Sequence, residues 1–199
     1  LYLCSAQGLP ERPSVVLTET VPTPSERWDE RVGTGARAAG DLNGDGIADF
    51  IVDRFDHEAS VYYGKAGGIS EKPDLDLPRT SAEGSYVACL PVGDLDKDGF
   101  ADVLMLWKKD SDTTKATLHR GSASGLATTG DPQPTATIFD GLLRRDAPRV
   151  LDFDGDGYGD LFGEPHPGFG SGNTIRANAF WFRGDSIGFF GTFRTVMRL

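Results

Sequence analysis

The chain has 199 residues, enough for one domain or two small ones, and 38% of them are hydrophobic, which excludes a wholly disordered chain. Its 30 acidic residues outweigh 20 basic ones, and the resulting formal charge of −10 argues against nucleic acid or an anionic membrane surface as a partner. No stretch approaches the roughly 20 apolar residues of a membrane span.

The N-terminal segment already carries part of a repeat. Residues Leu1–Leu9 match Leu118–Leu126 in the spacing of their Leu, Ser, Ala and Gly residues. We therefore expect the chain to open partway through a repeat, with Pro13–Thr18 as the outer strand of that unit. The chain also starts without Met, so we expect it to be a piece of a longer protein.

Three aspartate-rich segments of nine residues align without gaps. They read DLNGDGIAD at 41–49 (loop 1), DLDKDGFAD at 94–102 (loop 2) and DFDGDGYGD at 152–160 (loop 3). Their first residues are 53 and 58 positions apart, a spacing that fits one propeller blade per repeat.

Strand-like segments surround each loop. An earlier strand precedes the loop, as at Tyr86–Leu90, and three candidates follow it. The candidates lie at 50–52, 60–64 and 75–77 after loop 1, at 103–107, 116–121 and 136–138 after loop 2, and at 161–162, 179–184 and 191–193 after loop 3. The second candidates end in Gly64, Gly121 and Gly184, and a further turn is expected at Gly68, Gly125 and Gly188. We expect these glycines to supply the positive φ angles of tight turns.

Four short strands per unit, with no helical periodicity, predict an all-β chain of β-propeller blades, each a four-stranded antiparallel sheet. We expect one propeller segment over 1–199: the second half of a blade at 1–19, then blades at 20–80, 81–140 and 141–199. These make about three and a half blades, whereas closed propellers have about four to eight. We therefore expect part of a larger propeller, with seven blades as a candidate number. Assembly from several chains and an open array of blades are the alternatives.

The loops have the ligand pattern of a calcium site. Ca²⁺ takes six to eight oxygen ligands at about 2.3–2.6 Å, and side chains at positions 1, 3 and 5 of a tight loop converge on one point. Glycine at position 6 permits the sharp turn, position 7 offers its carbonyl and position 9 a further carboxylate. The predicted ligands, one set per ion and about three ions in all, are Asp41, Asn43, Asp45, the Ile47 carbonyl and Asp49; Asp94, Asp96, Asp98, the Phe100 carbonyl and Asp102; and Asp152, Asp154, Asp156, the Tyr158 carbonyl and Asp160.

Two other interpretations of the loops compete with this one. An EF-hand needs a bidentate Glu at position 12 and flanking helices, but position 12 is Val52, Met105 or Gly163 and the flanks look like strands. An Asp/Gly turn without metal would leave several carboxylates repelling one another, three times over. Loop 1 has Asn43 where the others have Asp, so we expect it to bind Ca²⁺ most weakly.

The repeats resemble the FG-GAP repeats of integrin α-subunits and the related VCBS-type repeats of bacterial secreted proteins. The matching segments are GDLNGDGIAD at 40–49, GDLDKDGFAD at 93–102, loop 3, and the turn GSASG at 121–125. The resemblance implies an extracellular, cell-surface or periplasmic protein, with adhesion or ligand binding more often than catalysis. Leu151 departs from the pattern because it replaces the glycine before the first Asp, and Cys4 replaces a turn glycine.

Other residues give weaker signals. Cys4 and Cys89 could pair, but two buried free thiols are the simpler interpretation. Arg183-Gly184-Asp185-Ser186 contains an integrin-recognition tripeptide, although its glycine coincides with the turn glycine of the repeat. The three histidines, His57, His119 and His166, are expected as surface or strand residues, and the three tryptophans, Trp28, Trp107 and Trp181, as packing residues or, alternatively, as sugar-stacking residues.

From these observations we predict a non-enzymatic, secreted or surface module for binding, adhesion or scaffolding, held rigid by Ca²⁺. The alternative is a carbohydrate-binding propeller (lectin) or the non-catalytic part of a polysaccharide-acting enzyme. The expected partners are a protein or glycan ligand, and the rest of the parent chain or another chain that completes the propeller.

Overall fold

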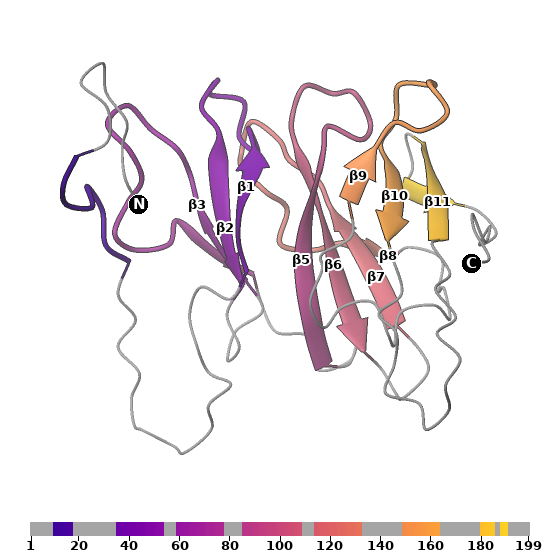
Figure 1. The fold of residues 1–199 in the computed structure, drawn as a ribbon, viewed down its shortest axis with the longest axis horizontal. Coiled ribbons are helices and arrows are strands. Elements are labelled where there is room, and N and C mark those ends of the chain that lie inside the picture. The colour runs from indigo at the N-terminus through magenta and orange to yellow at the C-terminus, as the bar shows by residue number, and fades with distance from the viewer. Residues whose placement is uncertain are drawn as a thin grey trace.

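A computed structural model of the chain describes residues 10–17, 35–53, 59–77, 85–108, 114–132, 149–163, 180–185 and 188–190. These residues form strands, turns and bends and contain no helix. They accordingly include no helix that is long and apolar enough to cross a membrane. The strands make three four-stranded antiparallel sheets, which lie side by side in chain order (Figure 1).

Each sheet is a meander of four consecutive strands. Sheet 1 contains β1 (Ala36–Gly40), β2 (Asp49–Asp53), β3 (Ala59–Tyr62) and β4 (Leu75–Leu77). Sheet 2 contains β5 (Ser85–Gly93), β6 (Asp102–Lys108), β7 (Thr114–His119) and β8 (Asp131–Pro132). Sheet 3 contains β9 (Arg149–Leu151), β10 (Asp160–Gly163), β11 (Phe180–Asp185) and β12 (Gly188–Phe190). The prediction of an all-β chain with blade-like sheets is confirmed.

The last strands of sheets 2 and 3 depart most from the sequence prediction. β4 lies where it was expected, but sheet 2 ends at β8, before the predicted 136–138, which falls outside the described residues. Pro132 is tolerated there because an edge strand needs no outward N–H donor. Sheet 3 ends at β12, so Gly188 begins a strand instead of forming a turn. The outer strand expected at Pro13–Thr18 is wrong for residues 13–17, which are not in strand conformation, and Thr18 lies outside the described residues.

The second strand of sheet 2, β6, is buried in the hydrophobic core. All five residues of Val103–Trp107 are buried, which explains a continuous apolar run in place of an alternating one. Val103, Met105 and Trp107 belong to a core cluster that also contains Ile51 and Val61 of sheet 1. Sheets 1 and 2 therefore share one hydrophobic core, and β5 is the strand that contacts β1 and β2.

A β-bulge precedes loops 1 and 2 but not loop 3. Pairing shifts by one residue between Ala38 and Gly40 in β1, and again between Pro91 and Gly93 in β5. Both glycines have a left-handed backbone, with φ of 79° and 74°. In sheet 3, Leu151 pairs directly with Asp160 and no shift occurs. The replacement of glycine by leucine therefore removes the bulge, because a leucine rarely adopts positive φ.

Candidate metal sites in the acidic loops

Each acidic loop joins the first strand of a sheet to the second, and backbone amides hold its carboxylates in place. The Asp at position 1 accepts a hydrogen bond from the position-6 glycine amide, at 2.7 Å in loop 1 and 2.9 Å in loops 2 and 3. The Asp at position 5 accepts one from the position-7 amide, at 2.8, 3.0 and 2.8 Å. The same two hydrogen bonds occur in all three loops, which shows one repeated local fold.

The backbone has positive φ at two positions of each loop, positions 4 and 6. The position-6 glycines, Gly46, Gly99 and Gly157, have φ of 82°, 96° and 86°, as the sequence predicts. Position 4 is also left-handed, and it is glycine in loops 1 and 3. In loop 2 this position is Lys97, with φ of 64°, and it is the one non-glycine residue of positive φ among those described.

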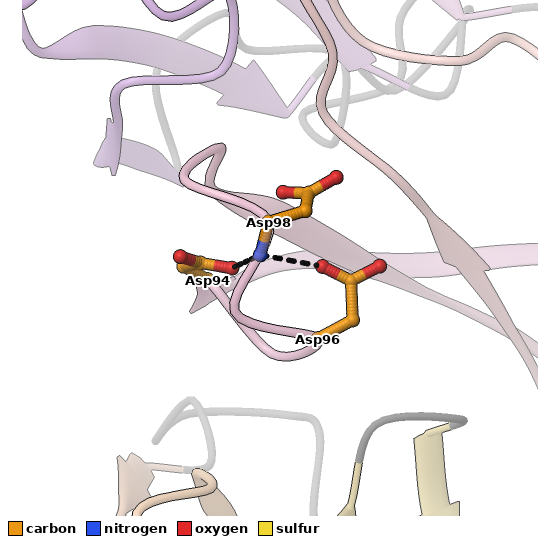
Figure 2. Close-up of side chains that lie close together, drawn as sticks. All are labelled: Asp94, Asp96 and Asp98. Carbon is orange, nitrogen blue, oxygen red and sulfur yellow. Dashed lines mark hydrogen bonds between the residues drawn. The ribbon is translucent and has the colours of Figure 1, made fainter.

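The structure brings the carboxylates of positions 1, 3 and 5 together. One oxygen each from Asp94, Asp96 and Asp98 lies within 4.8 Å of the others, and the same holds for the corresponding residues of loop 3, Asp152, Asp154 and Asp156. Figure 2 shows the first group, in which the Asp98 amide donates to both Asp94 and Asp96.

These separations fit a calcium ion. Oxygens that are about 2.3–2.6 Å from one ion can be at most about 5 Å apart, and the grouped oxygens meet that limit. The donors are all carboxylates with no nitrogen or sulfur, which favours a hard cation such as Ca²⁺ over zinc or copper. The strands that flank the loops also exclude the EF-hand interpretation.

Loop 1 has the same shape with one fewer carboxylate. The Asn43 side-chain oxygen accepts the Asp45 amide at 3.0 Å, as Asp96 and Asp154 accept the corresponding amides at 3.2 Å. The Asn43 amide group in turn donates to the Asp45 carboxylate at 3.3 Å. Asn43 therefore takes the place of an aspartate in the loop fold but supplies a neutral oxygen.

Replacing Asn43 with Asp is expected to tighten Ca²⁺ binding at loop 1 by about tenfold, because affinity in such loops rises with the number of charged ligands. The measurement is a calcium titration followed by the amide resonance of Gly46, which reports loop 1. Asn43→Ala, which lacks the oxygen, is the matched variant and should weaken binding. An unchanged midpoint in both variants would contradict a ligand role for position 3.

The position-9 aspartates have a role that the sequence interpretation missed. Asp102 is fully buried, and its two oxygens accept the amides of Leu95 and Gly121, each at 3.0 Å. Asp49 and Asp160 repeat this arrangement with the amide at loop position 2 and the turn glycine, at 2.7–2.9 Å. Each carboxylate therefore ties its loop to a glycine near the end of the third strand, just after it in sheets 1 and 2 and within it in sheet 3. Metal ligation by these residues, and by the position-7 carbonyls, stays a prediction.

Burial changes the acidity of these groups. Desolvation raises the pKa of Asp102 to about 6, against the two amide hydrogen bonds and the nearby Arg120, which lower it. The pKa of Asp49 is also raised, again chiefly by burial, with hydrogen bonds from Gly64 and Leu42 in opposition. A cation close to either carboxylate would favour its charged form.

The glycines that donate these hydrogen bonds to the position-9 aspartates have no room for a side chain. The sequence interpretation gave Gly64, Gly121 and Gly184 positive φ angles, and this is wrong for all three. A Cβ at these positions would lie 2.3, 2.3 and 2.0 Å from the backbone carbonyl oxygen of loop position 8. By contrast, Gly68 and Gly125 have φ of 128° and 94°, as predicted.

Neighbouring loops touch one another through positions 4 and 7. The Phe100 ring covers Gly44 so closely that a Cβ there would lie 2.3 Å from it. Lys97 repeats the contact with loop 3, and its ammonium lies 3.7 Å from the centre of the Tyr158 ring. The Ala101 amide also donates to the Asp41 carbonyl at 2.7 Å, which joins loop 2 to loop 1.

Two arginines lie against the carboxylates of loops 2 and 3. Arg183 pairs with Asp154 and Asp156, both at 2.8 Å, and Arg120 pairs with Asp96. Arg183 belongs to the Arg-Gly-Asp tripeptide, and Gly184 of the same motif donates to Asp160. In this structure, the tripeptide therefore lies within β11 and makes contacts that hold loop 3.

The other candidate residues are placed as follows. Cys89 is a buried free thiol. His119 lies in β7, but it is buried and bonded to Thr117 and Ala127, so the surface alternative is wrong for it. Trp107 is also buried, and its indole N–H donates to Thr117 at 3.1 Å, which leaves no face for a sugar. Cys4, His57, His166 and Trp28 lie outside the described residues, as does the Trp181 side chain.

Comparison with known proteins finds both a matching family model and a similar curated protein. A family model described as FG-GAP-like repeat matches residues 41–105, which contain loops 1 and 2. The chain is also similar to integrin alpha-4 of Xenopus laevis, with 30% identity over 141 residues. That alignment covers 63% of this chain and 14% of the integrin subunit, so the chain corresponds to a small part of the length of that relative.

Proposed function

Because the chain carries FG-GAP-like repeats and is similar to an integrin α-subunit, we propose that it is a calcium-stabilised module that binds another molecule outside the cell. The observation that carries this proposal is the pair of carboxylate triplets in loops 2 and 3, each gathered within 4.8 Å. The same similarities support binding as the role of the chain, and we therefore also propose a non-enzymatic role.

Calcium in this proposal braces the blades. The ion would be held by positions 1, 3 and 5 of a loop, and the position-9 carboxylate connects that loop to the next hairpin. Removing the repulsion among the carboxylates would fix the end of each sheet from which the loops project. The rigid blades would then offer a surface, away from the loops, to which a protein or glycan ligand binds.

Calorimetric titration with CaCl₂ tests the metal part of this function. We expect about three binding events. One of them, the event at loop 2, should be lost when Asp94 and Asp98 are both replaced by Asn. MgCl₂ is the control, because its stricter octahedral geometry should give weaker binding. If CaCl₂ gives no heat of binding above background in a metal-stripped protein, the result would contradict the proposal.

A glycan array tests the ligand class. The buried position of Trp107 removes one of the three tryptophans that a lectin could use for stacking. We therefore expect no strong sugar binding that depends on Trp107. Calcium-dependent binding to one glycan class would favour the lectin alternative.

We further propose that another blade of the same type packs on sheet 3. At loop position 2, Leu42 and Leu95 are fully buried, and Leu95 lies 3.4 Å from the Cβ position of Gly184 in the following sheet. The corresponding residue of loop 3, Phe153, is 51% exposed, and the neighbouring Leu151 is 53% exposed. The repeated pattern indicates that the missing cover is a fourth such sheet, from the same or another chain.

In the 199-residue chain, Phe153→Ala should therefore cost less than about 1 kcal/mol of unfolding free energy, whereas Leu95→Ala should cost about 2–5 kcal/mol. Urea unfolding of both variants gives these values. In a form extended by one more repeat, the cost of Phe153→Ala should rise to a value comparable with that of Leu95→Ala. An equal, small cost of Phe153→Ala in both forms would show that the next blade packs elsewhere.

A further inference from the structure

The residue before the turn glycine differs among the three sheets. It is Arg120 in sheet 2 and Arg183 in sheet 3, but Tyr63 in sheet 1. All three positions lie beside the loop of their own sheet, because the glycine that follows donates to the position-9 aspartate. The three sheets therefore offer a natural comparison at one site.

Both arginines contact carboxylates that are grouped for a metal. Arg183 places its Nε 2.8 Å from Asp154 and its terminal nitrogen 2.8 Å from Asp156. Arg120 forms an ion pair with Asp96, and lies 3.9 Å from Asp102. In each case the guanidinium neutralises the position-3 carboxylate from outside the loop.

Tyr63 does something different at the same position. Its hydroxyl accepts a hydrogen bond from the Leu126 amide of sheet 2 at 2.9 Å, and it carries no charge. Loop 1 is also the loop with three carboxylates, since position 3 is Asn43, while loops 2 and 3 have four each. The arginines thus lie beside the two loops that have the additional carboxylate, and each adds one positive charge there; loop 2 also contains Lys97.

We propose that Arg120 and Arg183 are internal counter-ions. They stabilise the metal-free forms of loops 2 and 3, and they compete with Ca²⁺ for the carboxylates of those loops. The inference rests on the calcium sites of the proposed function. A guanidinium paired with two ligand carboxylates must be displaced or must stay near a divalent ion that repels it. Both alternatives weaken calcium binding relative to a loop with the same carboxylates and no arginine.

Arg183→Gln tests this in a site-resolved way. In the titration, the amide resonances of Gly46, Gly99 and Gly157 report loops 1, 2 and 3 separately. We expect the variant to bind Ca²⁺ at loop 3 about three- to tenfold more tightly than the wild type, with loops 1 and 2 unchanged. Its melting temperature should fall in chelator and should recover to the wild-type value in saturating calcium.

Two matched variants complete the experiment. Arg183→Lys keeps the charge and should bind calcium nearly as the wild type does. Arg37→Gln removes an ion pair with Asp53 that touches no loop, so it should leave all three affinities unchanged and lower stability equally with and without calcium.

Each outcome decides between the interpretations. Unchanged affinity at loop 3 in Arg183→Gln would reduce the pair to a surface salt bridge, and weaker binding would show that the arginine supports the ligands; either result overturns the inference. If the wild-type protein binds no calcium at all, the proposed function fails first. If it binds calcium and Arg183→Gln changes nothing, only the counter-ion role fails.

Discussion

Transfer of the calcium-loaded protein into a chelator is expected to lower its melting temperature by roughly 10 °C or more. A ligand present at about 100 times its Kd contributes about 2.7 kcal/mol per site, and each kcal/mol corresponds to about 2–4 °C for a domain of this size. Eleven aspartates lie in the three loops, and three ions would bring the formal charge from −10 to about −4. Loss of the ions restores the repulsion among the carboxylates.

Differential scanning calorimetry in CaCl₂ and in EGTA gives this shift, and addition of excess calcium to the EGTA sample should reverse it. Elemental analysis must first show that the starting protein contains calcium. If a protein loaded in this way melts at the same temperature in EGTA, the ions do not brace the blades. A shift that sodium chloride alone reproduces would point to general charge screening instead.

Gly121→Ala is expected to destabilise the protein by about 3 kcal/mol or more. The new Cβ would lie 2.3 Å from the Ala101 carbonyl oxygen and 2.9 Å from the Leu42 carbonyl oxygen, and neither backbone atom can move freely. Relief of the clash would pull the Gly121 amide away from Asp102, which would leave a buried carboxylate without one of its two donors.

The matched control is Gly67→Ala. Gly67 has φ of 94° but open space around its Cβ position, so this change tests backbone strain alone and should cost about 1–2 kcal/mol. Urea unfolding of both variants in calcium measures the difference. Equal costs for the two substitutions would show that the close approach at Gly121 is not what requires glycine there.

Much of the fold is readable from the sequence because the loops are so regular. The Asp-x-Asp/Asn-x-Asp-Gly pattern places position 6 in a left-handed conformation, and the apolar run Val103–Trp107 marks a buried central strand. These are local properties. The edge strands are less predictable because they have few packing partners: β8 has two residues, one of them Pro132, and no sequence pattern separates it from the turn before it.

The missed features of the site arise from contacts between distant residues. Asp102 is one more carboxylate in a metal motif until the fold brings the Gly121 amide to it, 19 residues along the chain. Arg183 likewise reaches Asp156, 27 residues away, across the hairpin. The recurrence of glycine at the end of the third strand candidate in every repeat is the available signal, but only the geometry shows that the reason is a carbonyl at close range.

The link between Asp102 and Gly121 also bears on how the blades form. Neighbouring side chains on a strand point to opposite faces, so a slip of β7 by one residue against β6 would carry the Gly121 amide away from the carboxylate and place a side chain against the Ala101 carbonyl. The carboxylate thus penalises incorrect pairing of the central hairpin. Because all three sheets have the same link, it cannot distinguish one blade from another during folding. That distinction falls to contacts that differ along the chain, such as Phe100 on Gly44 and Lys97 on Tyr158.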